Sequence, residues 1–199
     1  MEAYAKPGSA TGRTSAWGVQ PLILDRWSPR AFLDRPIAER DLLGILEAAH
    51  WAPSCFNEQP WRFIVARTEN DRRQLSACLT PQNQVWAGRA PVLLVVLSSP
   101  NFTETGKPNR WHAFDAGTAW GYLALEASAR GLNAHAMGGF SQDKIRALYG
   151  VPEGWGIHAV VAVGHHGPKE SLPEDLRDRE LPSGRKPLNE CWAEAKFAF

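Results

Sequence analysis

Strand-length apolar runs recur along the chain and predict the strands of a sheet. Residues 91–97 are continuously apolar, which indicates a strand that is buried on both of its faces. Clear runs also occupy residues 61–67 and 157–163, and a shorter run occupies residues 132–137. Three or four strands separated by helical segments predict an α+β domain with a helix-flanked sheet.

Apolar positions three and four residues apart predict the helices. Leu42, Ile45, Leu46 and Ala49 fall on one helix face, and Pro53 ends that helix. Further helices are predicted for residues 22–25, 69–79 (ending at Thr80-Pro81), 111–130 and 141–149, the last with Ser141 as its cap.

The longest predicted helix, residues 111–130, is apolar on two sides. One stripe contains Trp120 and Leu123, and the other contains Tyr122 and Leu125. A helix of this kind lies centrally or at a subunit contact rather than on a monomer surface. Gly131 is expected to end it, because glycine readily adopts the left-handed conformation that follows a helix.

The chain of 199 residues is most simply one domain, spanning residues 21–199. Residues 1–20 are rich in Gly, Ser, Ala and Thr and predict a flexible N-terminal arm. Residues 168–187 are rich in proline and charge and predict a loop. An amphipathic tail with Trp192 and Phe199 follows that loop.

Composition and charge exclude several classes of protein. A net charge of +1 argues against long-range attraction to nucleic acid or to an acidic membrane surface. No uncharged apolar run reaches the roughly 18 residues that span a membrane, and residues 1–12 lack the apolar segment of a signal peptide. Cys55, Cys78 and Cys191 are widely spaced and odd in number, which favours free thiols and a reducing, cytoplasmic setting.

Residues 51–63 join a predicted helix to a predicted strand through a stiff loop. Pro53 and Pro60 stiffen it, because each fixes a backbone angle and restricts the residue before it. Asn57 and Gln59 add amide donors and acceptors between the prolines. Such a loop suits a flat heterocycle, and it equally suits a well-made helix-to-strand turn.

Two basic stretches could bind a phosphate. Arg26, Ser28 and Arg30 offer two guanidiniums and a hydroxyl within five residues, held by Pro29. Taken alone, this stretch is more simply a solvated turn with two surface arginines. Arg185 begins a second and weaker basic stretch.

Gly138 and Gly139 lie between a predicted strand and a predicted helix, so the backbone there could approach a ring or a phosphate. They form neither a dinucleotide fingerprint nor a P-loop. His165 and His166 are adjacent, so their side chains point apart on an extended chain, and no third metal ligand is spaced nearby. The sequence therefore designates no catalytic side chain and no metal ligand.

Taken in order, these segments resemble the FMN-dependent nitroreductase family. Its first half is matched by Arg26-Trp-Ser-Pro-Arg30-x-Phe32 and by Ala52-Pro-Ser-Cys-Phe-Asn57-x-Gln59-Pro-Trp61-x-Phe63. Its second half is matched by Asp115-x-Gly117, Gly131-Leu132, Met137-Gly-Gly-Phe140 and Arg185-Lys-Pro-Leu188. The resemblance runs from about residue 22 to residue 192, and its most specific block is Pro-Ser-x-x-Asn-x-Gln-Pro-Trp.

The resemblance implies a nitroreductase-like fold, in which helices flank a central, mainly antiparallel sheet. It also implies an intertwined, obligate homodimer with two FMN sites at its interface. The helix at residues 111–130 would form much of the dimer contact, and the C-terminal tail would pack on the partner subunit.

The same resemblance assigns cofactor-binding residues. Those that would hold the phosphate, ribityl chain and pyrimidine edge of FMN are Arg26, Trp27, Ser28 and Arg30, with Arg185 helping at the phosphate. Those that would line the ring from the opposite subunit are Pro53, Ser54, Cys55, Phe56, Asn57 and Gln59. Those that would lie along the isoalloxazine near N5 are Met137, Gly138 and Gly139.

The implied chemistry is that of the cofactor. NADPH or NADH would give a hydride to flavin N5 and leave, and an electron-poor acceptor such as a nitroaromatic or a quinone would then take the electrons, with ping-pong kinetics. Other acceptors (an enone or a halogenated substrate), a non-catalytic flavin-binding or redox-sensing protein, and a dimer that has lost its cofactor are the alternatives.

Two positions depart from the family pattern. Trp27 stands where Arg or His is frequent, and Ser183 stands where a basic residue is frequent. The phosphate would then depend on Arg26 and Arg185, which predicts weaker FMN binding than is usual. The polar excursion at residues 100–110 is short for a substrate lid, which predicts an open cleft.

Overall fold

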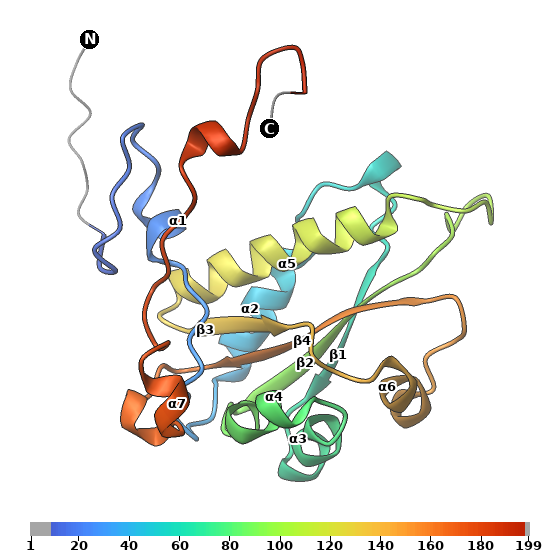
Figure 1. Ribbon diagram of the computed structural model, residues 1–199. Coiled ribbons are helices and arrows are strands. Elements are labelled where there is room, and N and C mark those ends of the chain that lie inside the picture. The colour runs from blue at the N-terminus through green and yellow to red at the C-terminus, as the bar shows by residue number, and fades with distance from the viewer. Residues whose placement is uncertain (1–8, 198–199) are drawn as a thin grey trace.

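A computed structural model of the chain describes residues 9–197, in which a four-stranded sheet carries helices on both faces (Figure 1). The strands are β1 (Trp61–Ala66), β2 (Val92–Ser98), β3 (Asn133–Met137) and β4 (Gly156–Gly164). They lie in the order β1-β2-β4-β3, and every neighbouring pair is antiparallel. The predicted α+β class and the antiparallel, helix-flanked sheet are confirmed.

β2 lies inside the sheet, and all of its residues are buried, as its continuous apolar run predicts. Successive side chains of a strand point to opposite faces. Leu93 and Val95 therefore join one core cluster, whereas Leu94 and Val96 join the other. A bulge beside Val96 leaves His158 of β4 without a partner residue on β2.

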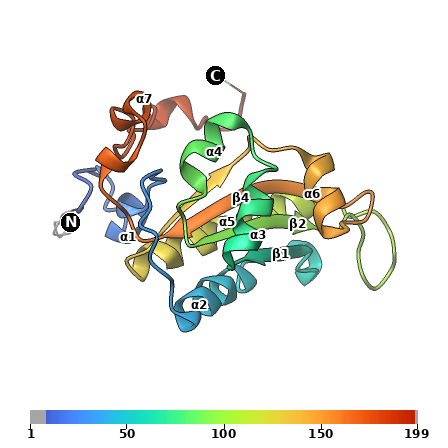
Figure 2. The same ribbon diagram turned by 90° about the horizontal axis from the view of Figure 1, so that it is seen from below.

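Each face of the sheet has its own set of helices. Helices α2 (Glu39–His50) and α5 (His112–Ala129) pack on one face, with α1 (Pro21–Asp25) against α5. On the other face lie α3 (Glu69–Ser76), α4 (Pro81–Ala87) and α6 (Gln142–Tyr149) (Figure 2). The remaining short elements are α7 (Glu174–Arg177) and the 3₁₀ turns Cys55–Asn57, Lys169–Ser171 and Leu188–Glu190.

Two predicted helix boundaries are confirmed by their hydrogen bonds and backbone angles. The Ser141 hydroxyl accepts a hydrogen bond from the Lys144 N–H at 3.3 Å and so caps α6. Gly131 follows α5 with a φ of 70°, and the Leu132 N–H bonds back to the Ala127 carbonyl at 2.8 Å.

Two predictions about elements are wrong. The sequence prediction ends a helix at Thr80-Pro81 and misses α4, which begins at Pro81, because proline suits the first turn of a helix as well as the end of the preceding one. Residues 168–187 are not wholly a loop. They contain α7, whose first turn carries Glu174 and Asp175, acidic residues that favour a helix N-terminus.

The N-terminal and C-terminal segments of the described chain run side by side near α1 (Figure 1), where Arg13 Nε donates to the Ser183 carbonyl at 3.1 Å. Within the predicted N-terminal arm, the Thr11 hydroxyl and Arg13 both donate to the Leu24 carbonyl. Residues 1–8 of that arm and Phe199 of the predicted tail lie outside the described residues. In the part of the chain that is described, no helix is both long enough and apolar enough to cross a membrane.

Candidate functional site

A cavity of about 350 Å³ is lined by arginines from separate segments of the chain, and we call it the arginine pocket. Its lining residues are Arg13, Arg26, Trp27, Ser28, Arg30, His135, Arg179, Leu181, Ser183 and Arg185. The sequence-predicted group at residues 26–30 and the distant Arg185 thus lie around one cavity. The spatial arrangement brings together two stretches that are each a weak signal alone.

The arginine pocket concentrates positive charge that no ion pair neutralises within residues 9–197. Among residues 9–197, none of its five arginines forms an ion pair with an Asp or Glu. Burial lowers the pKa of Arg26, and the charges of Arg185 and Arg13 lower it further. Burial and Arg179 likewise lower the pKa of Arg30, and Glu180 opposes them. Because the guanidiniums repel one another, a bound anion would stabilise the pocket.

The backbone of the arginine pocket is held by two groups from distant segments. The buried Glu180 carboxylate accepts hydrogen bonds from the N–H of Arg30 at 2.9 Å and of Ala31 at 2.7 Å. His135 Nδ1 lies 2.9 Å from the Pro29 carbonyl, which can only accept, so the ring carries its proton on Nδ1. Burial lowers the pKa of His135, which favours the neutral ring.

The two predicted glycines differ in their surroundings. Gly138 is exposed, and a side chain added there would meet no atom within 4 Å. Gly139 packs internally: its carbonyl accepts from the Thr80 N–H at 3.0 Å and from Asn83 Nδ2 at 3.1 Å, and a Cβ there would lie 2.7 Å from that Nδ2. Met137 is buried, with its side chain in the core cluster. Gly138 therefore offers the open backbone. At Gly139 a glycine is required because the neighbouring side chains leave no room for a Cβ.

The predicted loop between α2 and β1 is conformationally strained. Phe56, Asn57 and Gln59 have φ values of 52°, 55° and 52°, in the left-handed region that favours glycine. The Gln59 N–H donates to the Ser54 hydroxyl at 2.9 Å, which helps to fix this conformation. Backbone strain of this kind persists where the surroundings hold it, and it clusters at functional sites.

The same loop lies at the N-terminal end of α5. The Cys55 N–H donates to the buried Asp115 carboxylate at 3.2 Å. A second cavity of about 300 Å³ opens there, and its lining residues are Pro53, Ser54, Cys55, Trp111, Phe114, Asp115 and Thr118. The loop thus has an apolar hollow beside it but no cluster of cations.

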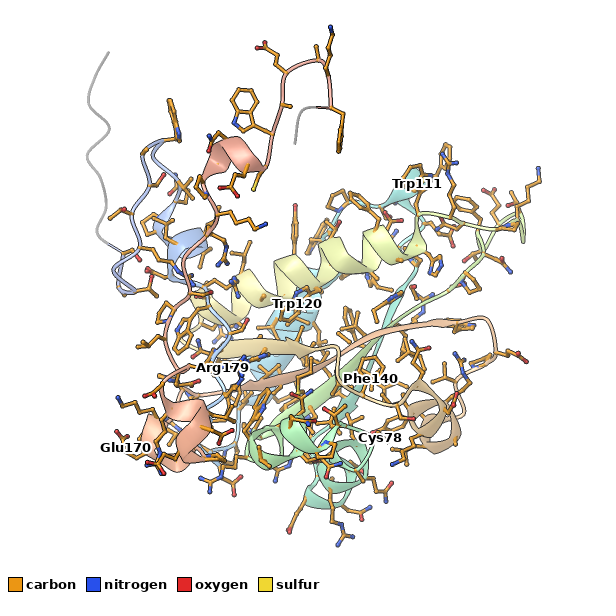
Figure 3. All side chains as sticks on the ribbon, viewed as in Figure 1. Cys78, Trp111, Trp120, Phe140, Glu170 and Arg179 are labelled. Carbon is orange, nitrogen blue, oxygen red and sulfur yellow. The ribbon has the colours of Figure 1, made fainter. Side chains whose placement is uncertain are left out.

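Within one chain, this loop and the arginine pocket lie apart and share no lining residue. β4 begins beside the loop, where Gly156 pairs with Ser98, and His135 of the pocket pairs with Ala162 further along β4. From Gly156 to Ala162 a strand rises by about 20 Å. Figure 3 accordingly shows Trp111, beside the loop, and Arg179, of the pocket, toward opposite ends of α5.

Four residues of this site were missed by sequence reasoning: Arg13, His135, Arg179 and Glu180. Arg13 lies in a polar segment without periodicity, and Arg179 and Glu180 lie in a segment where charge is abundant. Their partners lie far away in the sequence, so no local spacing indicates them. His135 could have been noted as a polar residue in a strand that leads to the glycine pair.

The fold and the arginine pocket define a protein with an antiparallel, helix-covered sheet and a cationic pocket beside the edge strand β3. The sequence profile of the Nitroreductase family matches residues 23–85 and 78–165. The chain belongs to this family.

Individual relatives agree with the family assignment. An NADH dehydrogenase of Thermus thermophilus is 34% identical over 173 residues, covering 71% of this chain and 83% of the relative. A solved structure described as an oxidoreductase containing FMN is 44% identical with a TM-score of 0.91, covering 96% of this chain and 98% of that one. A nitroreductase family protein from Clostridium difficile 630 has a TM-score of 0.70 at 23% identity, covering 88% and 97%, and shares the fold.

Proposed function

We propose that this protein is an FMN-dependent NAD(P)H oxidoreductase that passes electrons to an electron-poor acceptor such as a nitroaromatic or a quinone. The observation that carries the proposal is the arginine pocket, with five arginines and no carboxylate partner among the described residues. Membership of the Nitroreductase family supports it, as do the names of an FMN-containing structure and an NADH dehydrogenase among the relatives.

The residues present fit the phosphate end of FMN. A phosphate monoester is a dianion at neutral pH with several acceptor oxygens, and guanidiniums bind such oxygens through charge-assisted hydrogen bonds. β3 leads from His135, which lines the pocket, to the exposed Gly138 immediately after the strand. A flat ring system attached to the phosphate therefore has exposed backbone to lie against.

Each predicted binding residue has a role in this proposal. Arg26, Trp27, Ser28 and Arg30 hold the phosphate, ribityl chain and pyrimidine edge, with Arg185 at the phosphate. Gly138 and its neighbours Met137 and Gly139 line the reactive edge through their backbone. When bound, FMN accepts a hydride and passes electrons on. The positive charge of Arg30 favours the electron-rich state of the ring by Coulomb attraction.

We propose a homodimer in which residues 53–59 of one chain line the ring bound by the other. The rise of about 20 Å along β4, from its end beside this loop to its pairing with His135 of the pocket, supports that arrangement. Aromatic side chains near the loop support it too, since Phe56 is 91% exposed and Phe114 of α5 is 73% exposed. Large exposed aromatics grouped in this way are typical of an interface.

NADH or NADPH supplies the hydride, and the acceptor then occupies the same cleft, so that donor and acceptor bind in turn. The protein positions both molecules, and no side chain is assigned as nucleophile or general acid. The three cysteines are unpaired, which supports a reducing, cytoplasmic setting.

Steady-state kinetics of the FMN-loaded protein test the proposal. Initial rates are measured over a grid of NADPH or NADH and of p-benzoquinone or a nitrobenzene derivative. Parallel double-reciprocal lines are expected, because each substrate leaves before the other binds. Intersecting lines would contradict the shared cleft, and failure of both nicotinamides to support any turnover would contradict an oxidoreductase and favour a flavin-binding or sensing role.

A further inference from the structure

Arg13 enters the arginine pocket from the N-terminal segment, outside the part of the chain that resembles the family. Its Nε donates to the Ser183 carbonyl at 3.1 Å. Its Nη1 donates to the Leu24 carbonyl at 3.0 Å and to the Arg26 carbonyl at 2.8 Å. One side chain thus ties together the N-terminal segment, the end of α1 and the C-terminal segment.

This anchoring leaves part of the Arg13 guanidinium available to a ligand. A guanidinium has five N–H donors, and the three hydrogen bonds to carbonyls use those of Nε and Nη1. The two donors of Nη2 make no hydrogen bond within residues 9–197, and Arg13 lines the cavity. Fixed backbone contacts on one side and free donors on the other form a preorganised anion ligand.

Arg13 lies beside Ser183, a position at which the family resemblance leads us to expect a positive charge. Ser183 stands where the family often has a basic residue, and Arg13 is bonded to the carbonyl of that same residue. Trp27, the other departure, packs its ring edgewise against His166 with centroids 5.2 Å apart and supplies no charge. Arg13 therefore restores a cation beside Arg185. Burial lowers the pKa of Arg13 and the charge of Arg185 lowers it further, while Asp25 opposes them, so a bound anion would relieve the repulsion between the two arginines.

We infer that Arg13 is a phosphate ligand of the bound flavin mononucleotide and that it makes the protein select FMN over riboflavin. The inference rests on the proposed function, since FMN is the anion considered. It adds a third cation to Arg26 and Arg185, the two residues on which phosphate binding is otherwise expected to depend. The ligand chemistry is that of a phosphate monoester dianion, whose oxygens accept from Arg13 Nη2.

The test compares the dissociation constants of FMN and riboflavin, measured by quenching of flavin fluorescence in the purified full chain. The variants are Arg13→Ala, Arg13→Lys and a control, Arg40→Ala, which changes an exposed arginine of α2 away from the pocket. Loss of a charge-assisted hydrogen bond to phosphate is expected to raise the FMN dissociation constant about ten- to a hundredfold in Arg13→Ala. Riboflavin lacks the phosphate, so its dissociation constant is expected to change less than about twofold.

The Arg13→Lys variant and the comparison with riboflavin distinguish a phosphate ligand from a residue that is only structural. Arg13→Lys keeps the charge but not the fork of donors, so intermediate FMN affinity is expected. Equal losses for FMN and riboflavin would mean that Arg13 only holds the segments together, and this overturns the inference. An unchanged FMN affinity, with an altered KM for NADPH instead, assigns Arg13 to another phosphate and also overturns it.

The outcome for the unmodified protein distinguishes this inference from the proposed function. Wild-type protein that binds neither flavin refutes the proposed function, and the inference with it. Wild-type protein that binds FMN and riboflavin equally keeps a flavin function but refutes phosphate selection by Arg13.

Discussion

At the residue scale, the buried Glu180 carboxylate fixes the backbone of Arg30 and Ala31 by accepting their hydrogen bonds. It accepts from the N–H groups of Arg30 and Ala31, and His166 Nε2 lies 3.4 Å from it. The side chain of Glu180 is 1% exposed, so its carboxylate has little access to water. Arg30 depends on this acceptor for its position, although the two residues lie far apart in the sequence.

Replacing Glu180 therefore affects both stability and the arginine pocket. Glu180→Ala leaves buried N–H groups without an acceptor, which costs about 1–3 kcal/mol for each group. We expect the free energy of unfolding in urea to fall by about 2–4 kcal/mol and FMN to bind more weakly. Glu180→Gln keeps a carbonyl oxygen and should recover much of the loss. A Glu180→Ala protein with wild-type stability would show that these hydrogen bonds contribute little.

A second buried polar group links two histidines through one hydroxyl. Ser98 Oγ is buried and lies 2.6 Å from His112 Nδ1 and 2.6 Å from His158 Nε2. The hydroxyl donates to one ring and accepts from the N–H of the other, so two neutral rings satisfy the group. Burial lowers the pKa of His158, and the neighbouring His112 lowers it further.

The lowered pKa of His158 predicts a pH dependence of stability. Below the ordinary histidine pKa of about 6.5, the unfolded chain binds a proton that the folded chain does not. Stability should therefore fall as the pH drops from 7.5 to 5.5, and it should fall less in His158→Gln. Urea unfolding at several pH values measures this, with His50→Gln on the exposed end of α2 as control. Identical slopes for wild type and His158→Gln would contradict the assignment.

At the scale of elements, the polar excursion at residues 100–110 holds the strained loop. Glu58 Oε1 accepts hydrogen bonds from the N–H of Thr103 at 2.8 Å and from its hydroxyl. Phe56 meets Phe102 edge to face, with centroids 5.9 Å apart. The excursion, which the sequence predicts to be too short for a substrate lid, instead fixes the loop that carries the positive φ angles.

Because Phe56 is exposed but has a positive φ, its replacement by valine is predicted to destabilise the protein more than its replacement by glycine. Surface substitutions usually change stability by less than about 0.5 kcal/mol. Phe56→Val should lower the free energy of unfolding by about 1–2 kcal/mol, because a β-branched residue fits the left-handed region poorly. Phe56→Gly should cost less than Phe56→Val, because glycine adopts this region freely. Thermal unfolding of both variants checks the order, and equal effects would argue against backbone strain there.

Sequence reasoning succeeded best where periodicity and burial agree. β2 is predicted well because both of its faces are buried, and α5 because a glycine ends a long run without proline. α4 was missed because Pro81 serves as the first residue of a new helix. Local patterns thus predict the elements, and they fail where one residue type has two structural uses.

At the scale of the whole molecule, the arginine pocket is assembled from segments that no local pattern relates. Its lining comes from Arg13, the stretch at residues 26–30, His135 of β3 and the segment at 179–185, which meet around one cavity in the folded chain. The stretch at residues 26–30 and Arg185 were indicated by their basic side chains and by the family resemblance. Arg13, Arg179 and Glu180 could not be, because their contacts are set by tertiary packing.

The exposed side of α5 is the surface on which we expect a second copy of the chain to pack. Phe114 and Tyr122 are exposed there, and a Cβ added at Gly117 would meet no atom within 4 Å other than α5's own backbone. Gly117→Arg should therefore leave the chain folded but prevent a second copy from packing closely. We expect wild type to sediment at about twice 22.0 kDa, and Gly117→Arg to be monomeric with weak FMN binding.

Gln74→Arg is the matched control, since it adds the same charge on α3, across the sheet from α5. It should remain a dimer with wild-type FMN binding. A monomeric wild type with full FMN affinity would contradict a site shared between two chains.

The most direct test of the account is an anaerobic absorbance spectrum of the FMN-loaded protein before and after NADH or NADPH is added. The account predicts that the visible flavin bands bleach within seconds and return when a quinone is mixed in. Bands that persist with both nicotinamides would contradict the central claim that this protein is an NAD(P)H oxidoreductase.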